Sequence, residues 1–160
     1  MDTELFELAE QVGHILKVRR KTIATAESCT GGGIAQAITE VPGSSVWFDR
    51  GFVTYSNAAK VQMLGVNPHT LEHYGAVSAE TAAEMAAGAL ARSDAGVAVA
   101  VTGIAGPDGE TPDKPIGTVF IAWVHKNGEA KTVKKKFAGN RRQIREQTVK
   151  SALEGIWLFY

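Results

Sequence analysis

Residues 22–38 read TIATAESCTGGGIAQAI, and this stretch determines the class of fold. Its first six residues are mostly small or β-branched, which is typical of a short strand. Three consecutive glycines at 31–33 end the strand pattern, and an apolar segment through Ile38 then indicates a helix. A strand that passes through a glycine-rich turn into a helix favours an α/β layered fold.

The rest of the chain supplies further helices and strands around this unit. The pattern predicts helices at 3–20, from the Ser56 cap through Leu64, at 79–92 and from the Asn140 cap to the C-terminus. It predicts strands at 50–55 and 95–101, and a hairpin of 117–125 and 129–137 about Asn127-Gly128. The order of these elements predicts one three-layer α/β/α domain over residues 1–160, with a mixed sheet.

Composition excludes several classes of function. Seventeen basic and seventeen acidic residues give a formal net charge of zero, so nothing favours non-specific binding to nucleic acid. Cys29 is the only cysteine, which excludes an internal disulfide and favours the reducing cytoplasm. No apolar run is long enough for a membrane span, and residues 1–10 lack a signal-peptide pattern. The four histidines are scattered, so no metal site is expected.

Ser28 stands where the predicted strand ends and the glycine turn begins. Backbone N–H groups at such a turn can bind a phosphate or an oxyanion, and Gly31 and Gly32 leave them unobstructed. A serine there can act as a nucleophile, although the sequence is not Gly-x-Ser-x-Gly. A helix cap with packing glycines explains the same residues equally well. Cys29 competes for the nucleophile role, but a small buried cysteine is the favoured interpretation.

Lys60 is a candidate general base. If Ser56 caps the helix, Lys60 falls in its first turn or just past it, where the helix dipole opposes a cation. Partial burial would also lower its pKa, and a lysine with a lowered pKa can accept the proton of a serine nucleophile. The alternative is an ordinary surface lysine.

A second glycine-rich stretch covers residues 102–109 and follows the most apolar strand. Two such turns at strand ends suggest one crevice, because open α/β sheets bind ligands there. Gly103, Ile104 and Gly106 are then candidate donors of backbone N–H groups. An ordinary long loop is the alternative.

Arg141 and Arg142 begin the last predicted helix. Two cations at a helix N-terminus are electrostatically unfavourable, and a bound anion would relieve this. A solvated basic turn, continuous with the lysines at 131 and 134–136, is the alternative. The two arginines at the start of this helix therefore indicate either an anion-binding site or a solvated basic turn.

Taken together, these segments resemble the nicotinamide-nucleotide amidohydrolases, the C-terminal domain family of the competence/damage-inducible protein CinA. The matching segments keep their order over nearly the whole chain, at 26–32, 42–45, 51–57 with Lys60, 75–78, 102–107 and 114–119. The resemblance implies a stand-alone, single-domain form. It also implies that the carboxamide of nicotinamide mononucleotide is hydrolysed to nicotinic acid mononucleotide and ammonia, without a metal or cofactor.

The resemblance further implies roles for particular residues. Ser28 is the expected nucleophile and Lys60 the expected general base. Ser45 and Tyr55 are expected to belong to the proton relay or to orient Lys60.

Thr102 and Arg142 are the substrate contacts that the resemblance implies, and Arg142 offers a cation at a helix N-terminus to the substrate phosphate. A non-catalytic nucleotide-binding or regulatory module is the alternative function. We also expect a homodimer, because the C-terminal residues 157–160 (WLFY) are apolar for a free tail.

Overall fold

The computed structural model describes residues 2–160, except for the side chains of Leu158 and Phe159. Its helices are α1 (Thr3–Val18), α2 (Gly33–Thr39), α3 (Asn57–Leu64), α4 (Pro68–Tyr74), α5 (Ala79–Ala91) and α6 (Arg141–Glu154), with 3-10 turns at Ser44–Val46 and Gly155–Phe159. Its strands are β1 (Ile23–Glu27), β2 (Phe48–Val53), β3 (Val97–Gly103), β4 (Thr118–His125) and β5 (Ala130–Lys136).

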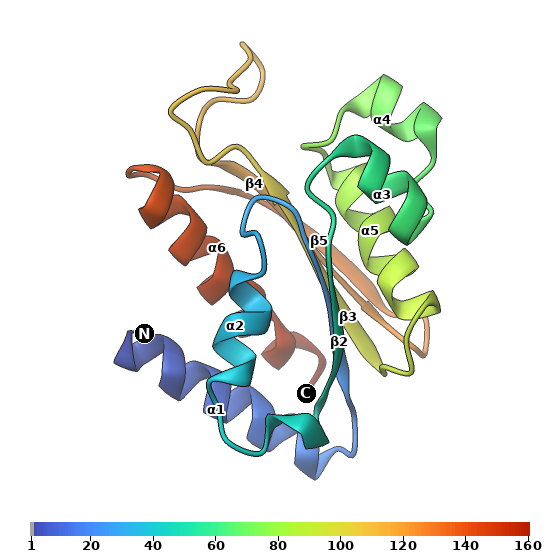
Figure 1. The fold of residues 1–160 in the computed structure, drawn as a ribbon, viewed down its shortest axis with the longest axis vertical. Helices are drawn as coiled ribbons and strands as arrows, with labels where there is room; N and C mark the ends of the chain where they lie inside the picture. The colour runs from blue at the N-terminus through green and yellow to red at the C-terminus, as the bar shows by residue number, and fades with distance from the viewer. Residues whose placement is uncertain (1) are drawn as a thin grey trace.

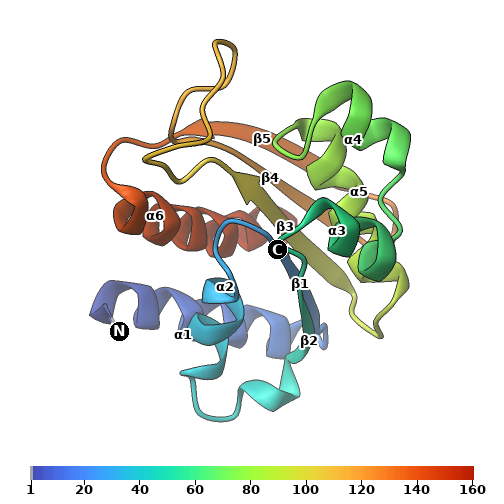
Figure 2. The same ribbon diagram turned by 45° about the horizontal axis from the view of Figure 1, so that its top comes forward.

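The strands form one mixed sheet in the order β2-β1-β3-β4-β5. The strands β2, β1 and β3 run parallel to one another, whereas β4 is antiparallel to both of its neighbours, β3 and β5. Helices α1, α2 and α6 cover one face, and α3, α4 and α5 lie on the other (Figure 1). A second view shows the same two helical layers with the sheet between them (Figure 2). The predicted three-layer α/β/α fold with a mixed sheet is confirmed.

The central strand β3 explains how the two layers pack. Its valines belong to the apolar core beneath α1, α2 and α6, whereas Ala98 and Ala100 belong to the core beneath α5. Successive side chains of a strand point to opposite faces, so this alternation gives each face its own core. Ala82, Ala86 and Ala89 of α5 are fully buried, and their small side chains allow the helix to pack closely on the sheet.

Some predicted boundaries are wrong. The strand predicted at 95–101 lies two residues later, since Gly96 is still outside the ladder and its N–H donates to Thr22. The last α-helix ends at Glu154 instead of continuing to the C-terminus. Helix α4 was not predicted, although its start is well marked, with an Asn67 side-chain cap and Pro68 in the first turn.

The C-terminal residues give limited support to the predicted dimer contact. Tyr160 packs on its own chain, with its hydroxyl 2.8 Å from Nε2 of His125 and the Arg19 guanidinium 6.0 Å from its ring centroid. Trp157 is 45% exposed. The side chains of Leu158 and Phe159 lie outside the described part of the chain. Among the described side chains of residues 157–160, Trp157 is therefore the one exposed enough to pack against a second copy of the chain.

Gly88 allows α5 to pack closely against the end of α3. A Cβ atom at Gly88 would overlap the carbonyl oxygen of Leu64, which is backbone and cannot move independently. We therefore expect Gly88→Ala to destabilise the fold by about 1–3 kcal/mol, although alanine is the better helix former. Urea unfolding checks this, with Ala87→Gly on the exposed face of α5 as the control that measures helix propensity alone. A Gly88→Ala variant more stable than the parent chain would contradict the close packing.

Candidate active site

Parallel pairing brings three chain segments to one edge of the sheet. Glu27 at the end of β1 lies between Val53 of β2 and Val101 of β3. β1 and β2 end at this level, and β3 continues for two more residues to Gly103, so the segments that follow the three strands leave the same end of the sheet. The crevice predicted from the two glycine-rich turns lies at this edge, which is the upper edge in Figure 1.

Ser28 is the first residue after β1. Its N–H still donates to the carbonyl of Val101 at 3.1 Å, so the residue is held in line with the sheet. The chain then turns through Gly31 and Gly32, which have φ values of 59° and 105° that favour glycine. Because α2 begins only at Gly33, Ser28 is the last residue held by the strand and not the cap of the helix.

Lys60 meets Ser28 from the opposite helical layer. The Ser56 side chain caps α3 by accepting from Ala59 at 2.9 Å, and the N–H of Lys60 donates to the Ser56 carbonyl. Lys60 therefore stands in the first turn, as predicted. Its side chain is only 1% exposed, so the alternative of a surface lysine is wrong. The Lys60 Nζ lies 2.9 Å from the Ser28 Oγ.

The other neighbours of the Lys60 amine fix its direction. Its Nζ donates to the carbonyls of Thr54 and Tyr55, each at 3.0 Å. Burial lowers the pKa of Lys60 and so favours the neutral amine, while the nearby Cys29 has a smaller opposite effect. All three contacts have Nζ in donor geometry toward an oxygen, as a charged amine requires. In the neutral form, with its two hydrogens on the carbonyls, the lone pair would face the Ser28 hydroxyl, and an amine in that geometry can accept the serine proton.

Cys29 lies beside this pair but is a poor nucleophile. The residue is buried, and burial raises the pKa of its thiol to about 12. The thiolate is the reactive form, so this environment suppresses its chemistry. The preference for a buried structural cysteine is confirmed.

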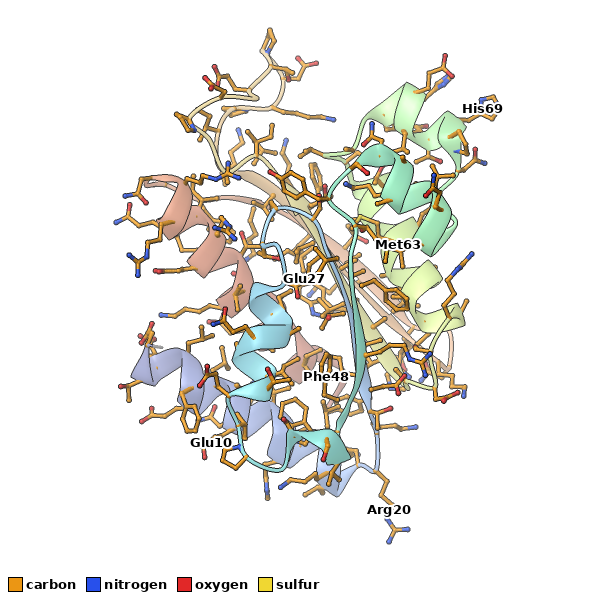
Figure 3. All side chains as sticks on the ribbon, in the orientation of Figure 1. Glu10, Arg20, Glu27, Phe48, Met63 and His69 are labelled. Atoms are coloured by element: carbon orange, nitrogen blue, oxygen red, sulfur yellow. The ribbon has the colours of Figure 1, made fainter. Side chains whose placement is uncertain are left out.

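Glu27 occupies the N-terminus of α2. Its carboxylate accepts from the backbone N–H groups of Ile34 and Ala35 at 2.8 and 3.0 Å and from the Thr30 hydroxyl at 2.5 Å. The side chain is fully buried beside the first turn of the helix (Figure 3). The first N–H groups of α2 are therefore taken, which corrects the prediction that Gly31 and Gly32 present a free helix N-terminus to an anion.

The N–H groups that remain are in the turn itself. Those of Cys29, Thr30 and Gly32 donate to no acceptor of another residue in the described chain, 2–160. Gly31 is different, because its N–H donates to the Ser28 carbonyl at 3.1 Å. Donors for an oxyanion are thus available next to Ser28, at the residues that follow it.

A cavity of about 250 Å³ opens over Ser28 and Lys60. Its wall is mostly small or apolar, apart from Tyr55 and a cation. The further lining residues are Cys29, Ala76, Val77, Gly103, Ala105 and Arg141. Gly103 thus lies at the site, as the second glycine-rich turn predicted. Ala76 and Val77, which join α4 to α5, were not predicted.

Arg141 replaces Arg142 as the cation at this cavity. The Arg141 guanidinium donates to the Gly106 carbonyl at 2.9 Å and to the Tyr55 hydroxyl at 3.2 Å. Arg142 lies on another face of α6, where it is 88% exposed and pairs with Glu146 at 3.1 Å. Arg142 does not line the cavity over Ser28 and Lys60 but a neighbouring one of about 370 Å³, so its predicted contact with the substrate is not found at this cavity.

Three predicted groups of the second glycine-rich stretch have other partners. The Thr102 hydroxyl is buried and donates to the carbonyl of Ala76 at 2.8 Å, so it holds the neighbouring loop instead of lining the cavity. The Ile104 N–H donates to Thr118 at 2.9 Å and is not available to a ligand. Gly106 contributes its carbonyl, which Arg141 contacts, in place of the predicted N–H.

Ser45 is not brought to this site. It lies in the 3-10 turn that precedes β2, and Phe48 at the start of β2 pairs with Ile23 at the start of β1. Ser28 follows the other end of β1, and the strand between spans about 13 Å at the usual rise per residue. The prediction that Ser45 belongs to the proton relay beside Lys60 is wrong within one chain.

Two charged residues that support the site carried no predicted role. Glu27 was part of the matching segment, but a carboxylate inside a strand pattern does not by itself indicate a helix cap. Arg145 of α6 donates to the carbonyls of Cys29 and Thr30 and was not singled out. Among residues 2–160, no group of three or more His, Cys, Asp or Glu side chains is arranged to hold a metal ion.

The fold and the site together define a class: an α/β protein with a serine and a buried lysine paired at the end of a parallel strand. The sequence profile of the CinA C-terminal domain matches residues 5–159, and the chain belongs to this family.

Individual relatives agree with this assignment. The chain is 52% identical to the nicotinamide-nucleotide amidohydrolase PncC of Escherichia coli, over 98% of this chain and 94% of that protein. The Pseudomonas putida protein of the same name is 51% identical, over 93% and 92%. The solved structure of the competence/damage-inducible protein CihA from Agrobacterium tumefaciens matches with a TM-score of 0.97 and 47% identity, over 99% of this chain and 96% of that one.

Proposed function

We propose that this chain hydrolyses the carboxamide of nicotinamide mononucleotide to nicotinic acid mononucleotide and ammonia, a reaction of pyridine-nucleotide recycling. The observation that carries the proposal is the 2.9 Å contact between the Ser28 Oγ and a buried lysine amine that also contacts the carbonyls of Thr54 and Tyr55. Two relatives of about half-identical sequence, named nicotinamide-nucleotide amidohydrolase, support the substrate. Incubating the purified protein with the mononucleotide and measuring ammonia and the acid product tests it, and no release under these conditions would contradict it.

In the proposed first half of the reaction, the Ser28 Oγ attacks the carboxamide carbon while its proton passes to the Lys60 Nζ. The N–H groups that follow Ser28 stabilise the oxyanion of the tetrahedral intermediate. When the intermediate collapses, the carbon–nitrogen bond breaks and Lys60 returns the proton to the leaving nitrogen. Ammonia departs and an ester of Ser28 remains.

The second half repeats these proton transfers with water. Lys60 accepts a proton from a water molecule as its oxygen attacks the ester carbon, and a second tetrahedral intermediate forms. Collapse of this intermediate breaks the ester bond, and Lys60 returns the proton to the Ser28 Oγ. The product leaves as a carboxylic acid that loses its proton to solvent to give the carboxylate, and both residues regain their starting states.

The rest of the cavity suits a small flat amide with an anionic group attached. The Tyr55 ring and the alanine and valine side chains offer apolar surfaces to an aromatic ring, and Tyr55 orients Lys60 through its backbone carbonyl. Arg141 at the rim has guanidinium donors beyond the two it uses, and these can bind a phosphate.

Removal of the Arg141 charge gives a test of this phosphate contact. We expect Arg141→Gln to raise the KM for nicotinamide mononucleotide by about 10- to 100-fold, because a charge-assisted hydrogen bond to the phosphate is lost. The riboside, which lacks the phosphate, should be affected much less. Arg142→Gln is the matched control and should leave the KM unchanged. An Arg142→Gln variant with the larger effect would contradict the placement of the phosphate at Arg141.

The proposal includes the cytoplasm as the compartment and a homodimer as the assembly. The single buried cysteine suits a reducing compartment, and exposed Trp157 offers an apolar contact near the C-terminus. Within residues 2–160, the structure has no helix with the length and apolar character needed to cross a membrane. Sedimentation equilibrium checks the dimer, and a mass of one chain across micromolar concentrations would contradict it.

A further inference from the structure

Arg145 connects α6 to the turn that follows Ser28. Its Nε donates to the Cys29 carbonyl at 3.0 Å and a terminal nitrogen donates to the Thr30 carbonyl at 3.2 Å. The guanidinium is half-buried, and no carboxylate is paired with it among residues 2–160. One planar cation therefore holds two consecutive peptide groups of the turn.

These contacts determine where the N–H groups of the turn point. In a trans peptide the C=O and N–H bonds point in opposite directions. The carbonyl of Cys29 faces Arg145, so the N–H of Thr30 in the same peptide group points away from α6. The preceding peptide group is fixed separately, because its Ser28 carbonyl accepts from Gly31 at 3.1 Å. The unpaired N–H groups of Cys29 and Thr30 therefore have set directions.

We propose that Arg145 is a positioning residue for the N–H groups that stabilise the oxyanion when Ser28 attacks the amide. It holds the Thr30 N–H directly, through the Cys29 carbonyl, and the Cys29 N–H indirectly, because the Thr30 carbonyl that it binds shares a peptide group with the Gly31 N–H, which donates to the Ser28 carbonyl. This inference rests on the proposed function. Its guanidinium does not touch the substrate in this scheme, since both contacts are to carbonyls of the turn. The positive charge also polarises the two peptide groups, which strengthens the Thr30 N–H as a donor to the oxyanion and the Gly31 N–H as a donor to the Ser28 carbonyl.

The neighbouring Arg142 provides a matched control on the same helix. It is a guanidinium three residues earlier, largely exposed, and it pairs with Glu146 and with no residue of the turn. Removal of either arginine changes the net charge equally. A difference between the two variants therefore reports the contacts of Arg145 with the turn.

Two rates test the proposal: turnover of nicotinamide mononucleotide and phosphonylation of Ser28 by a fluorophosphonate probe, which yields a tetrahedral adduct with an oxyanion-like oxygen. We expect Arg145→Gln to lower both rates by about 10- to 100-fold, with the KM unchanged within about twofold, because oxyanion donors act on the transition state. Arg142→Gln should leave both rates unchanged. An Arg145→Gln variant that is phosphonylated at the wild-type rate would overturn the proposal. A wild-type chain that is labelled but releases no ammonia contradicts the proposed substrate instead.

Chemical rescue separates positioning from a loss of folding. Arg145 lines a second cavity of about 370 Å³ between α1, α2 and α6, so a guanidinium ion can reach the space that Arg145→Ala leaves. We expect a few millimolar guanidinium chloride to raise the phosphonylation rate of Arg145→Ala by about tenfold, and an equal concentration of sodium chloride to leave this rate unchanged. A folded Arg145→Ala variant that guanidinium leaves slow would assign the loss to altered packing and overturn the proposal.

Discussion

Replacing Ser28 with alanine is expected to lower kcat for nicotinamide mononucleotide by at least about a thousandfold, because the variant has no oxygen to form the acyl ester. The fold should be retained. The Ser28 side chain makes one hydrogen bond, to Lys60, and the backbone N–H that holds it to Val101 is unaffected by the change. Ammonia release and thermal unfolding of the same preparation measure both effects.

Cys29→Ala is the matched control for this variant. The thiol is buried and its pKa is raised, so its removal should cost some packing energy and leave kcat within a few-fold of the parent chain. Mass spectrometry of protein labelled with a fluorophosphonate should place the adduct on Ser28. Full turnover by Ser28→Ala would mean that a bound water or another side chain attacks the amide, and the ester mechanism would be abandoned.

The main features of this site could be predicted because each depends on local sequence. The Ser56 cap sets the start of α3, and that start alone places Lys60 in the first turn. The glycines after Ser28 report a turn, since they adopt φ values that other residues avoid. The crevice follows from a general property of parallel sheets, whose strand ends meet at one edge.

The helical periodicity of α6 distinguishes Arg141, which lines the cavity, from Arg142, which does not. Adjacent helical residues are separated by about 100°, so only one of them can face the sheet. Buried Ile144 and Thr148 lie three and seven residues after Arg141, which places that arginine on the buried face of α6. This periodicity was present in the sequence. The same spacing includes Arg145, four residues after Arg141.

Ser45 and Glu27 depended on information that the sequence does not hold. The distance of Ser45 from Ser28 follows from the direction and register of β2, and these come from pairing between strands. Glu27 interrupts a strand pattern of small and apolar residues, and its partners are N–H groups seven and eight residues later. Only the angle at which α2 leaves the turn brings those groups to the carboxylate.

Lys60→Met should also remove activity, with a loss in kcat of at least about a hundredfold, because no other described side chain is placed to accept the Ser28 proton. The parent chain should lose kcat/KM as the pH falls and Lys60 becomes protonated, with an apparent pKa below that of ordinary lysine. A non-catalytic binding module would bind the mononucleotide with unchanged affinity after this substitution and show no turnover to lose. Isothermal titration and a pH–rate profile distinguish the two.

The stability of Lys60→Met should depend on pH in a way that identifies the amine. Burial lowers the pKa of Lys60 in the folded chain, so the unfolded chain binds more protons between that pKa and the ordinary lysine value. The parent chain therefore gains stability as the pH rises through this range, whereas Lys60→Met cannot gain it. The variant loses the hydrogen bonds to the carbonyls of Thr54 and Tyr55 at every pH. The prediction therefore concerns how the difference in stability between variant and parent changes with pH, and not its size at one pH.

We expect the stability of Lys60→Met relative to the parent to fall with rising pH in urea unfolding, whereas exposed Lys135→Met shows no such trend. A flat difference for Lys60→Met would mean that the amine stays charged in the folded chain, which would contradict its proposed role as a base.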